Sequence, residues 1–244
     1  MRKLFASIII SLTIGITAYA QGLSRYELDV KDFSELKVVE GVNVTYICNT
    51  DSAGRAVFVA SDDVASALIF NNTNNRLDIR IATNYITAKN LPSVTVYSKS
   101  LSKVENSGDS TVRVNKLAPC TQFKARLIGN GQLIVKDIDV THLDGSIDTG
   151  RGQLEISGKV TSSRLSNTGV GTIIAKELSS EETKCVMLGS GTINCQAQKK
   201  LNIVGLSSGK VYYKGNPEEI KKHSVGVKVI PIEEEKEEEQ SPNN

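Results

Sequence analysis

The chain has 244 residues, of which 39% are hydrophobic and 5% aromatic, with 29 Lys and Arg against 27 Asp and Glu. This length is enough for one sizeable domain or two small ones. A net charge of +2 in a chain with 23% charged residues excludes an acidic disordered protein, and it gives no electrostatic basis for binding nucleic acid.

The first twenty residues have the organisation of a secretory signal peptide. Arg2 and Lys3 precede an apolar run over residues 4–16, and the Ala-Tyr-Ala sequence at 18–20 supplies a small-x-small cleavage pattern. No later stretch approaches the roughly 20 apolar residues that a spanning helix needs. We therefore predict removal of residues 1–20 and a mature chain without a transmembrane segment, exported to the periplasm or outer surface of a Gram-negative cell. A retained N-terminal anchor helix is the alternative.

The first half of the mature chain is rich in short segments of alternating apolar and polar residues, which is typical of strands. These segments cover residues 36–39, 42–46, 57–59, 77–81 and 94–97. Between them, residues 62–70 are expected to form one helical turn or a bulged loop, and the Asn-rich run 71–75 a turn. Because no linker separates the halves, we expect one continuous solenoid with wider early coils.

A repeat with a period near twenty residues governs the second half. Corners of the form Gly-x-Gly precede alternating strand residues, and isolated glycines start and end the series. The repeated glycines are Gly108, Gly131, Gly152, Gly171, Gly191 and Gly209, at intervals of 23, 21, 19, 20 and 18 residues. Self-similarity at such a period indicates a solenoid.

Alignment on these corners gives chemically uniform columns. Two positions after the corner glycine lie Leu133, Leu154, Ile173, Ile193 and Val211, and four positions after it lie Val135, Ile156, Ala175, Cys195 and Tyr213. The position between them is mixed, as expected where side chains alternate between the interior and the surface. Each coil therefore contributes an inward pair of side chains at this point.

Three short segments in about twenty residues leave no room for a crossover helix, so successive coils must stack in parallel. The predicted fold is all-β: a single-stranded, right-handed parallel β-helix with short coils, the hand following the general preference of parallel crossovers. A β-sandwich also has many short strands, but it gives no reason for fixed columns at this period.

A second column upstream of each corner contains polar residues. Asp148 and Asn167 are expected to point inward there, where they could satisfy backbone groups of neighbouring coils. We interpret them as structural rather than catalytic.

The end of the chain changes composition. Residues 225–230 are expected to close the C-terminal end of the stack, because an open edge would invite aggregation. Residues 233–239 contain six Glu and one Lys. We predict a β-helix domain over 21–232 and a solvated, disordered acidic tail over 233–244, with binding of a cation or a basic partner as the alternative for the tail.

The four cysteines Cys48, Cys120, Cys185 and Cys195 permit up to two disulfides in three possible pairings. Their spacing resembles no zinc pattern. Because a chain of this length can build its own core, buried free thiols are the equal alternative.

These motifs resemble a known family. Phe33 to Val38 leads to Gly41-Val42-Asn43-Val44, then to residues 76–79 and the glycine ladder. This order is similar to the putative auto-transporter adhesin, head GIN domain family, over roughly residues 28–215. The resemblance implies a β-helical domain in exported bacterial proteins, many of them from Bacteroidetes. It implies no catalytic, metal or cofactor residues.

An enzyme on the same fold is the main alternative, since β-helices host polysaccharide lyases and glycoside hydrolases that use paired carboxylates. The best local cluster is Asp137, Asp139, Asp144 and Asp148 with His142, which could bind calcium. The repeat lacks the G-G-x-G-x-D calcium signature, however, and Asp is ordinary in turns. We predict no catalytic residues, no metal and no cofactor.

The outward column is the predicted interaction face, formed by Ile134, Ile174, Asn194 and Tyr212. A flat face with a regular spacing suits a repetitive glycan, a protein surface ligand or a second subunit. The sequence therefore favours an exported, non-catalytic protein of the cell envelope with an adhesive or surface-interaction role. A structural envelope component without a small ligand is the third reading.

Overall fold

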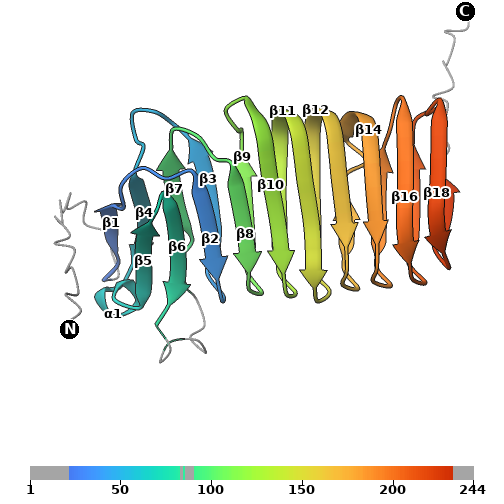
Figure 1. Cartoon of the computed structure of the whole chain (residues 1–244). Coiled ribbons are helices and arrows are strands. Elements are labelled where there is room, and N and C mark those ends of the chain that lie inside the picture. Colours follow the sequence, from blue (N-terminus) through green and yellow to red (C-terminus); the bar gives the residue numbers. More distant parts are fainter. Residues whose placement is uncertain (1–21, 83–84, 86–90, 233–244) are drawn as a thin grey trace, which may run out of the picture.

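The protein, seen here as a computed structural model, is an elongated stack of strands (Figure 1). The structure describes residues 22–82, 85 and 91–232. The predicted signal peptide and acidic tail lie outside these described residues. Within them, the stack runs from the first strands at one end to the last strands at the other, so position along the sequence largely follows position along the axis.

The described residues form nineteen strands and one turn of helix, α1, over Asp62–Ala65. In chain order the strands are β1 Ser24–Asp29, β2 Glu35–Val39, β3 Val44–Cys48, β4 Arg55–Ala60, β5 Leu68–Thr73, β6 Arg76–Ile81, β7 Val94–Ser98, β8 Lys103–Ser107, β9 Thr111–Asn115, β10 Cys120–Ile128, β11 Gln132–Thr149, β12 Gln153–Asn167, β13 Thr172–Ile174, β14 Leu178–Met187, β15 Thr192–Gln196, β16 Lys200–Leu206, β17 Lys210–Lys214, β18 Glu219–Val225 and β19 Lys228–Pro231.

The coils of the second half stack in parallel, with three blocks of pairing per coil. Strand β11 pairs with β12 over residues 132–135, 138–140 and 142–147, and the register shifts between Val135 and Ile138. Each partner lies 20 or 21 positions later in the sequence, as in Gln132 with Gln153. Three short sheets therefore wrap one interior, and the predicted fold class, a parallel β-helix with coils of about twenty residues, is confirmed.

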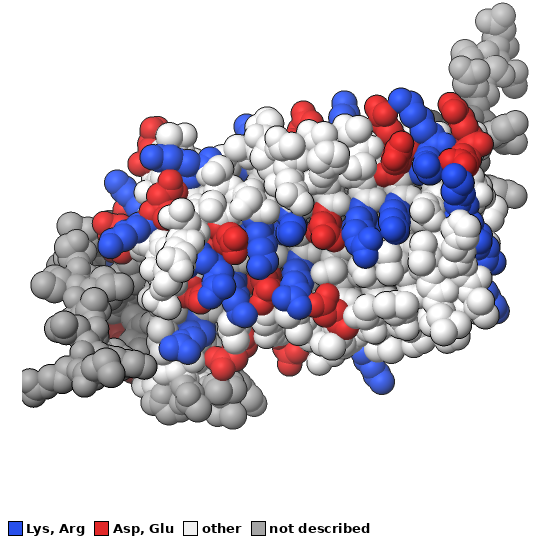
Figure 2. All heavy atoms as spheres, in the orientation of Figure 1, with Lys and Arg blue, Asp and Glu red and all other residues white. Residues whose placement is uncertain are grey.

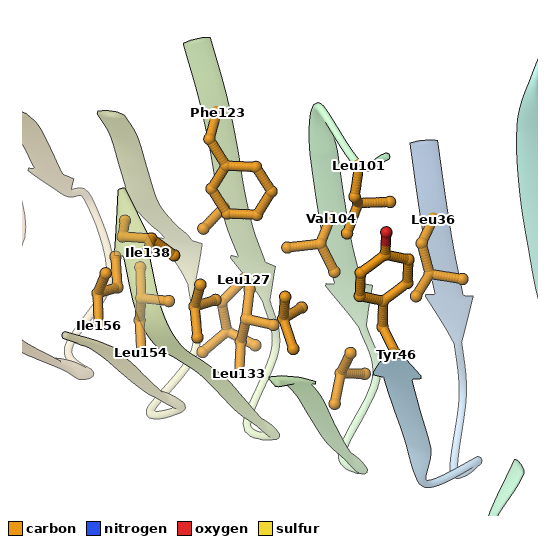
Figure 3. Packing of buried hydrophobic residues seen from close by; sticks show 14 of the residues in the cluster. Leu36, Tyr46, Leu101, Val104, Phe123, Leu127, Leu133, Ile138, Leu154 and Ile156 are labelled. Atoms are coloured by element: carbon orange, nitrogen blue, oxygen red, sulfur yellow. The ribbon is translucent and has the colours of Figure 1, made fainter. Parts of the chain in front are cut away.

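The predicted inward column is continuous in the structure. Leu133 pairs with Leu154, Leu154 with Ile173, Ile173 with Ile193, and Ile193 with Val211. All five side chains are fully buried. Figure 3 shows the aliphatic side chains of neighbouring coils pointing into the shared interior. Because every coil buries the same kind of side chain at the same place, the core extends along the whole stack without a break.

Buried asparagines satisfy the backbone at two corners. Asn167 is fully buried, its side-chain amide donates to the carbonyls of Gly171 and Thr192 at 2.9 and 3.3 Å, and its carbonyl oxygen accepts from Gly169 N–H at 3.1 Å. Asn106, in the same column three coils earlier, makes the equivalent bonds. The prediction that Asn167 points inward to bond the backbone is therefore confirmed.

Asp148 does not share this column, and its predicted inward position is wrong. The inward residue of its coil is Ile147, which pairs with Leu127 on one side and Asn167 on the other. Side chains alternate along a strand, so Asp148 faces outward, where its carboxylate accepts from Arg126 Nε at 2.7 Å.

The early coils differ from the expected simple widening, because they do not stack in sequence order. Strand β2 lies between β6 and β8, and β3 lies between β7 and β9, all in parallel. The first coil of the chain is thus inserted between the second and the third.

Antiparallel strands finish the N-terminal end of the stack. Strand β1 pairs with β4, β4 with β7, and β5 with β6. The β5–β6 hairpin turns at Asn74 and Asn75, whose φ angles of 54° and 62° are the left-handed values that a tight two-residue hairpin requires. The expected Asn-rich turn is therefore only two residues long, and Asn71 to Thr73 belong to β5. The helical turn expected within 62–70 is α1.

The last coil lies at the C-terminal end of the stack. None of the described residues packs over its open edge. Strand β18 pairs with β16, and β19 with β17. Leu206 and Val225 at this end are 72% and 69% exposed. Residues 225–230 thus complete the final coil, but in the described part of the chain they do not close its edge as expected.

Candidate binding surfaces

The predicted interaction face is one ladder on the outer side of the first sheet. Ile134 pairs with Glu155, Glu155 with Ile174, Ile174 with Asn194, and Asn194 with Tyr212. We call these five residues the outer ladder. All are half-buried, so each presents an edge rather than its full side chain to solvent.

The outer ladder has a polar neighbour on the same sheet. Two residues earlier in the first four of these strands, Gln132, Gln153, Thr172 and Thr192 form a ladder of amides and hydroxyls, and Lys210 follows in the fifth. Glu155 is held by Lys136, with Nζ to Oε1 at 3.8 Å. Along this face, neighbouring coils about 4.8 Å apart therefore place an outer-ladder residue beside a residue of the polar ladder.

A polar groove that sequence reasoning missed runs over a neighbouring face. It encloses about 580 Å³ and crosses five coils, with Thr121, Thr141 and Thr161 at equivalent places. Two carboxylates line it, Asp139 and Glu181, and Lys199 Nζ lies 2.8 Å from the Glu181 carboxylate. The threonines recur every twenty residues, so the signal was in the sequence, but only the folded coil shows that this corner is concave.

An apolar pocket of about 510 Å³ opens at the N-terminal end of the stack, between β1, β4, β5 and α1. Its wall includes three aromatic rings: Phe58 stacks on Tyr26 at a centroid distance of 5.2 Å and on Phe70 at 5.9 Å. At the rim, the Tyr26 hydroxyl donates to Asp62 at 2.5 Å, and this hydrogen bond raises the pKa of the tyrosine. Sequence reasoning missed this pocket because its walls come from antiparallel strands outside the repeat.

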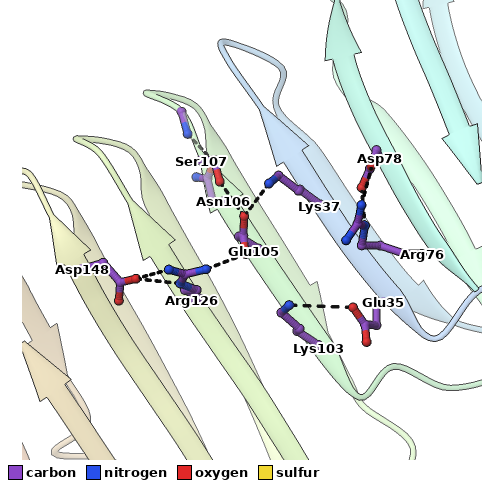
Figure 4. A network of polar contacts seen from close by, with 11 residues as sticks. Glu35, Lys37, Arg76, Asp78, Lys103, Glu105, Asn106, Ser107, Arg126 and Asp148 are labelled. Atoms are coloured by element: carbon purple, nitrogen blue, oxygen red, sulfur yellow. Dashed lines mark hydrogen bonds and ion pairs between the residues drawn. The ribbon is translucent and has the colours of Figure 1, made fainter. Parts of the chain in front are cut away.

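Figure 4 shows a chain of charges across the sheet that contains β2, β8, β10 and β11. Glu105, with its side chain only 6% exposed, lies 2.9 Å from Lys37 Nζ and 3.3 Å from Arg126 Nη1. Burial alone would raise the pKa of Glu105, but the hydrogen bonds from Lys37 and Ser107 and the charges of Lys37 and Arg126 lower it overall.

This charge network links neighbouring coils of the stack. Arg126 also binds Asp148, and the hydrogen bond to that carboxylate raises the pKa of the guanidinium. Figure 2 shows that basic and acidic side chains are mixed over one face of the molecule rather than gathered by sign. Because its members neutralise one another, the network ties successive coils together and offers no concentrated field to a charged ligand.

Two members of the aspartate cluster singled out in the sequence have other partners in the structure. Among the residues that the structure describes, no three His, Cys, Asp or Glu side chains are arranged to hold a metal ion. His142 instead shares a 2.7 Å hydrogen bond with Ser162, and Asp148 binds Arg126. The described chain also contains no helix that is both long and apolar enough to cross a membrane.

The fold places the protein among the parallel β-solenoids. Its coils turn at glycines, and side chains of successive coils pair in register on its outer faces. The chain belongs to the family described as putative auto-transporter adhesin, head GIN domain, which matches residues 32–217. The resemblance inferred from the sequence is thereby confirmed. A search of curated proteins finds no match.

Solved structures share the fold at low sequence identity. A putative adhesin from Bacteroides fragilis aligns with a TM-score of 0.74 and 20% identity, over 87% of this chain and 96% of that one. A putative lipid binding protein from Parabacteroides distasonis aligns at 0.70 and 19%, over 87% and 98%. A putative adhesin from Parabacteroides merdae aligns at 0.67 and 18%, over 87% and 97%. At such identities the likeness is one of fold.

Proposed function

We propose that this chain is an exported, non-catalytic protein of the bacterial cell envelope, which binds an extended glycan or protein ligand along its outer ladder. The observation that carries the proposal is the unbroken register of that ladder over five successive coils, in β11, β12, β13, β15 and β17. A regular spacing lets a repetitive ligand make the same contact at each coil, so many weak contacts add. The adhesin description of the family and of two of the solved structures supports the same role.

The double substitution Ile134→Lys and Ile174→Lys tests this surface. Both side chains are half-buried and face outward, so lysine can reach solvent while removing apolar contact and adding charge. We expect retention on an array of immobilised glycans and matrix proteins to fall about tenfold or more. Sedimentation velocity measures in parallel whether the ladder mediates self-association.

The matched control places the same two charges in the polar groove, as Thr141→Lys and Thr161→Lys. If this pair weakens retention while the ladder pair does not, the groove is the binding site and the ladder proposal fails. The same array, scored for cleavage, tests the enzyme alternative. Turnover that is lost when Asp139 and Glu181 become amides would assign the groove to a carbohydrate-active enzyme.

A second candidate function is the binding of a lipid or another apolar molecule in the N-terminal pocket. The observation in its favour is the stacked aromatic wall formed by Tyr26, Phe58 and Phe70, in a pocket whose volume is typical of small-molecule sites. The solved structure described as a putative lipid binding protein supports it. The rim carries Asp29, Lys31 and Asp62, so charges of both signs surround the mouth.

The substitution Ala65→Phe tests the pocket by filling it from α1. We expect the fluorescence titration of a neutral apolar dye, N-phenylnaphthylamine, to show about tenfold weaker binding or none. Asp63→Phe is the control. Asp63 is exposed and does not line the pocket, so this substitution adds the same ring to the same helical turn outside the pocket. Equal dye binding by both variants would remove this candidate.

A further inference from the structure

Two thiols meet inside the core. Cys185 of β14 and Cys195 of β15 are ten positions apart in the sequence, and both side chains are fully buried. Their sulfur atoms lie 3.6 Å apart. Between them the chain turns through the corner Gly189-Ser190-Gly191, so the two side chains reach the interior from two different sheets. All four cysteines are free thiols in the structure.

The stacking of the coils shows that these two positions face each other across the interior. Gly145 and Leu165 precede Cys185 in its column. Glu155, Ile174 and Asn194 pair in register, so Ile156 and Cys195, each one position later, share a second column. A side chain added at Gly145 would meet Ile156 Cδ1 at 3.0 Å, so the two columns are in contact there as well. One coil fills this space with a glycine and an isoleucine, whereas the later coil fills it with two cysteines.

We propose that Cys185 and Cys195 form an intramolecular disulfide bond that staples the interior of this coil. The two thiols lose two protons and two electrons as the sulfur–sulfur bond forms. A disulfide-bearing oxidant, either a thiol oxidoreductase of the envelope or oxidised glutathione, accepts the electrons and is reduced to two thiols. Bond formation requires the sulfur atoms to close from 3.6 Å to about 2.05 Å. Export, as proposed above, brings the chain to an oxidising compartment.

Burial fixes when the bond forms. The hydrogen bond to Cys195 and the loss of hydration raise the pKa of the Cys185 thiol well above its ordinary value, so the folded protein disfavours the reactive thiolate. No part of either side chain is exposed to an oxidant. The bond therefore forms before the coil closes, and once formed it is shielded from reductants by the same burial.

The variant Cys48→Ala, Cys120→Ala isolates the pair. Both substituted residues are only partly buried, and their thiols donate to the carbonyls of Lys99 and Gln122 rather than to another cysteine. The chain is unfolded in urea, refolded with oxidised or with reduced glutathione, unfolded again with iodoacetamide present, and weighed by mass spectrometry. After oxidative refolding we expect no alkylated cysteine, a mass lower by two hydrogen atoms, a monomeric band on a non-reducing gel and a higher urea midpoint than that of the reduced form.

Two alkylated cysteines after oxidative refolding, or bridges found only between chains, would overturn the proposal. So would a lower urea midpoint for the bridged form, because a bridge that strains the coil is not its native state. A second arm does not depend on refolding: the wild-type protein is taken from cells that export it, its thiols are trapped in acid, and its peptides are mapped without reduction. A peptide pair joining Cys185 to Cys195 supports the bond, and both cysteines recovered as alkylated thiols contradict it.

Discussion

Replacing Gly150 with alanine should destabilise the solenoid by at least about 3 kcal/mol. Gly150 has a φ of +84°, a backbone conformation that is strained for any residue with a Cβ atom. A Cβ atom would also overlap the backbone of Gly129 in the neighbouring coil. Because Gly129 is itself held in the stack, the overlap can be relieved only by moving the two coils apart, which breaks the ladder between them. Urea unfolding monitored by circular dichroism measures the loss.

Gly41→Ala is the matched control for this prediction. Its added Cβ atom would meet only Leu91 Cδ1 at 3.8 Å, an ordinary van der Waals contact, and its φ lies outside the left-handed region. We expect its free energy of unfolding to stay within about 0.5 kcal/mol of wild type. Similar midpoints for both variants would show that the corners tolerate side chains and that close stacking does not select glycine.

The substitution Leu154→Ala should cost about 2–5 kcal/mol. Leu154 is fully buried, and it packs in register between Leu133 of the coil before and Ile173 of the coil after. Both neighbours are fixed by their own strands, so the interior cannot collapse into the space that the lost side chain leaves. The measurement is again the free energy of unfolding in urea, with the slope of the transition compared between variants.

Glu155→Ala, one residue further along the same strand, provides the contrast. Its side chain lies in the outer ladder, and its ion pair with Lys136 at 3.8 Å is open to solvent. We expect a loss of no more than about 1 kcal/mol. A larger loss at Glu155 than at Leu154 would reverse the assignment of inner and outer faces, and the outer ladder would no longer be a surface.

The sequence predicts the repeated part of this fold well. Residues at the same position in successive coils have the same burial, so their chemical similarity in the sequence identifies the column. The aliphatic residues at Leu133, Leu154 and Ile173 are equivalent only if the coils stack in parallel, and the structure pairs them directly. Asp148 was misplaced by one position because the register shifts next to it, at the pairing of Leu127 and Ile128 with β11. An irregularity of one residue reverses the side on which a strand residue lies.

The parts that were not predicted depend on pairing between strands far apart in the chain. Strand β2 lies between β6 and β8, and no repeat in the sequence indicates this position. The alternation of apolar and polar residues predicts a strand but not the strands with which it pairs. The apolar pocket depends on that arrangement, because Tyr26 and Phe58 meet only through the antiparallel pairing of β1 with β4. The outer ladder, by contrast, follows from the repeat, and its role in binding remains a prediction.

The inserted position of the first coil sets which parts of the chain must be available before that coil is complete. Glu35 pairs with Arg76 and with Lys103, which lie 41 and 68 residues later in the sequence. Later coils close over only about twenty residues, so the larger closure costs about 1 kcal/mol more in chain entropy. Once it is made, the remaining coils can be added one by one onto a finished template. Loss of C-terminal coils should therefore shorten the stack, because each coil contacts only its neighbours, whereas loss of β6 or β8 should leave β2 without one of its two parallel partners.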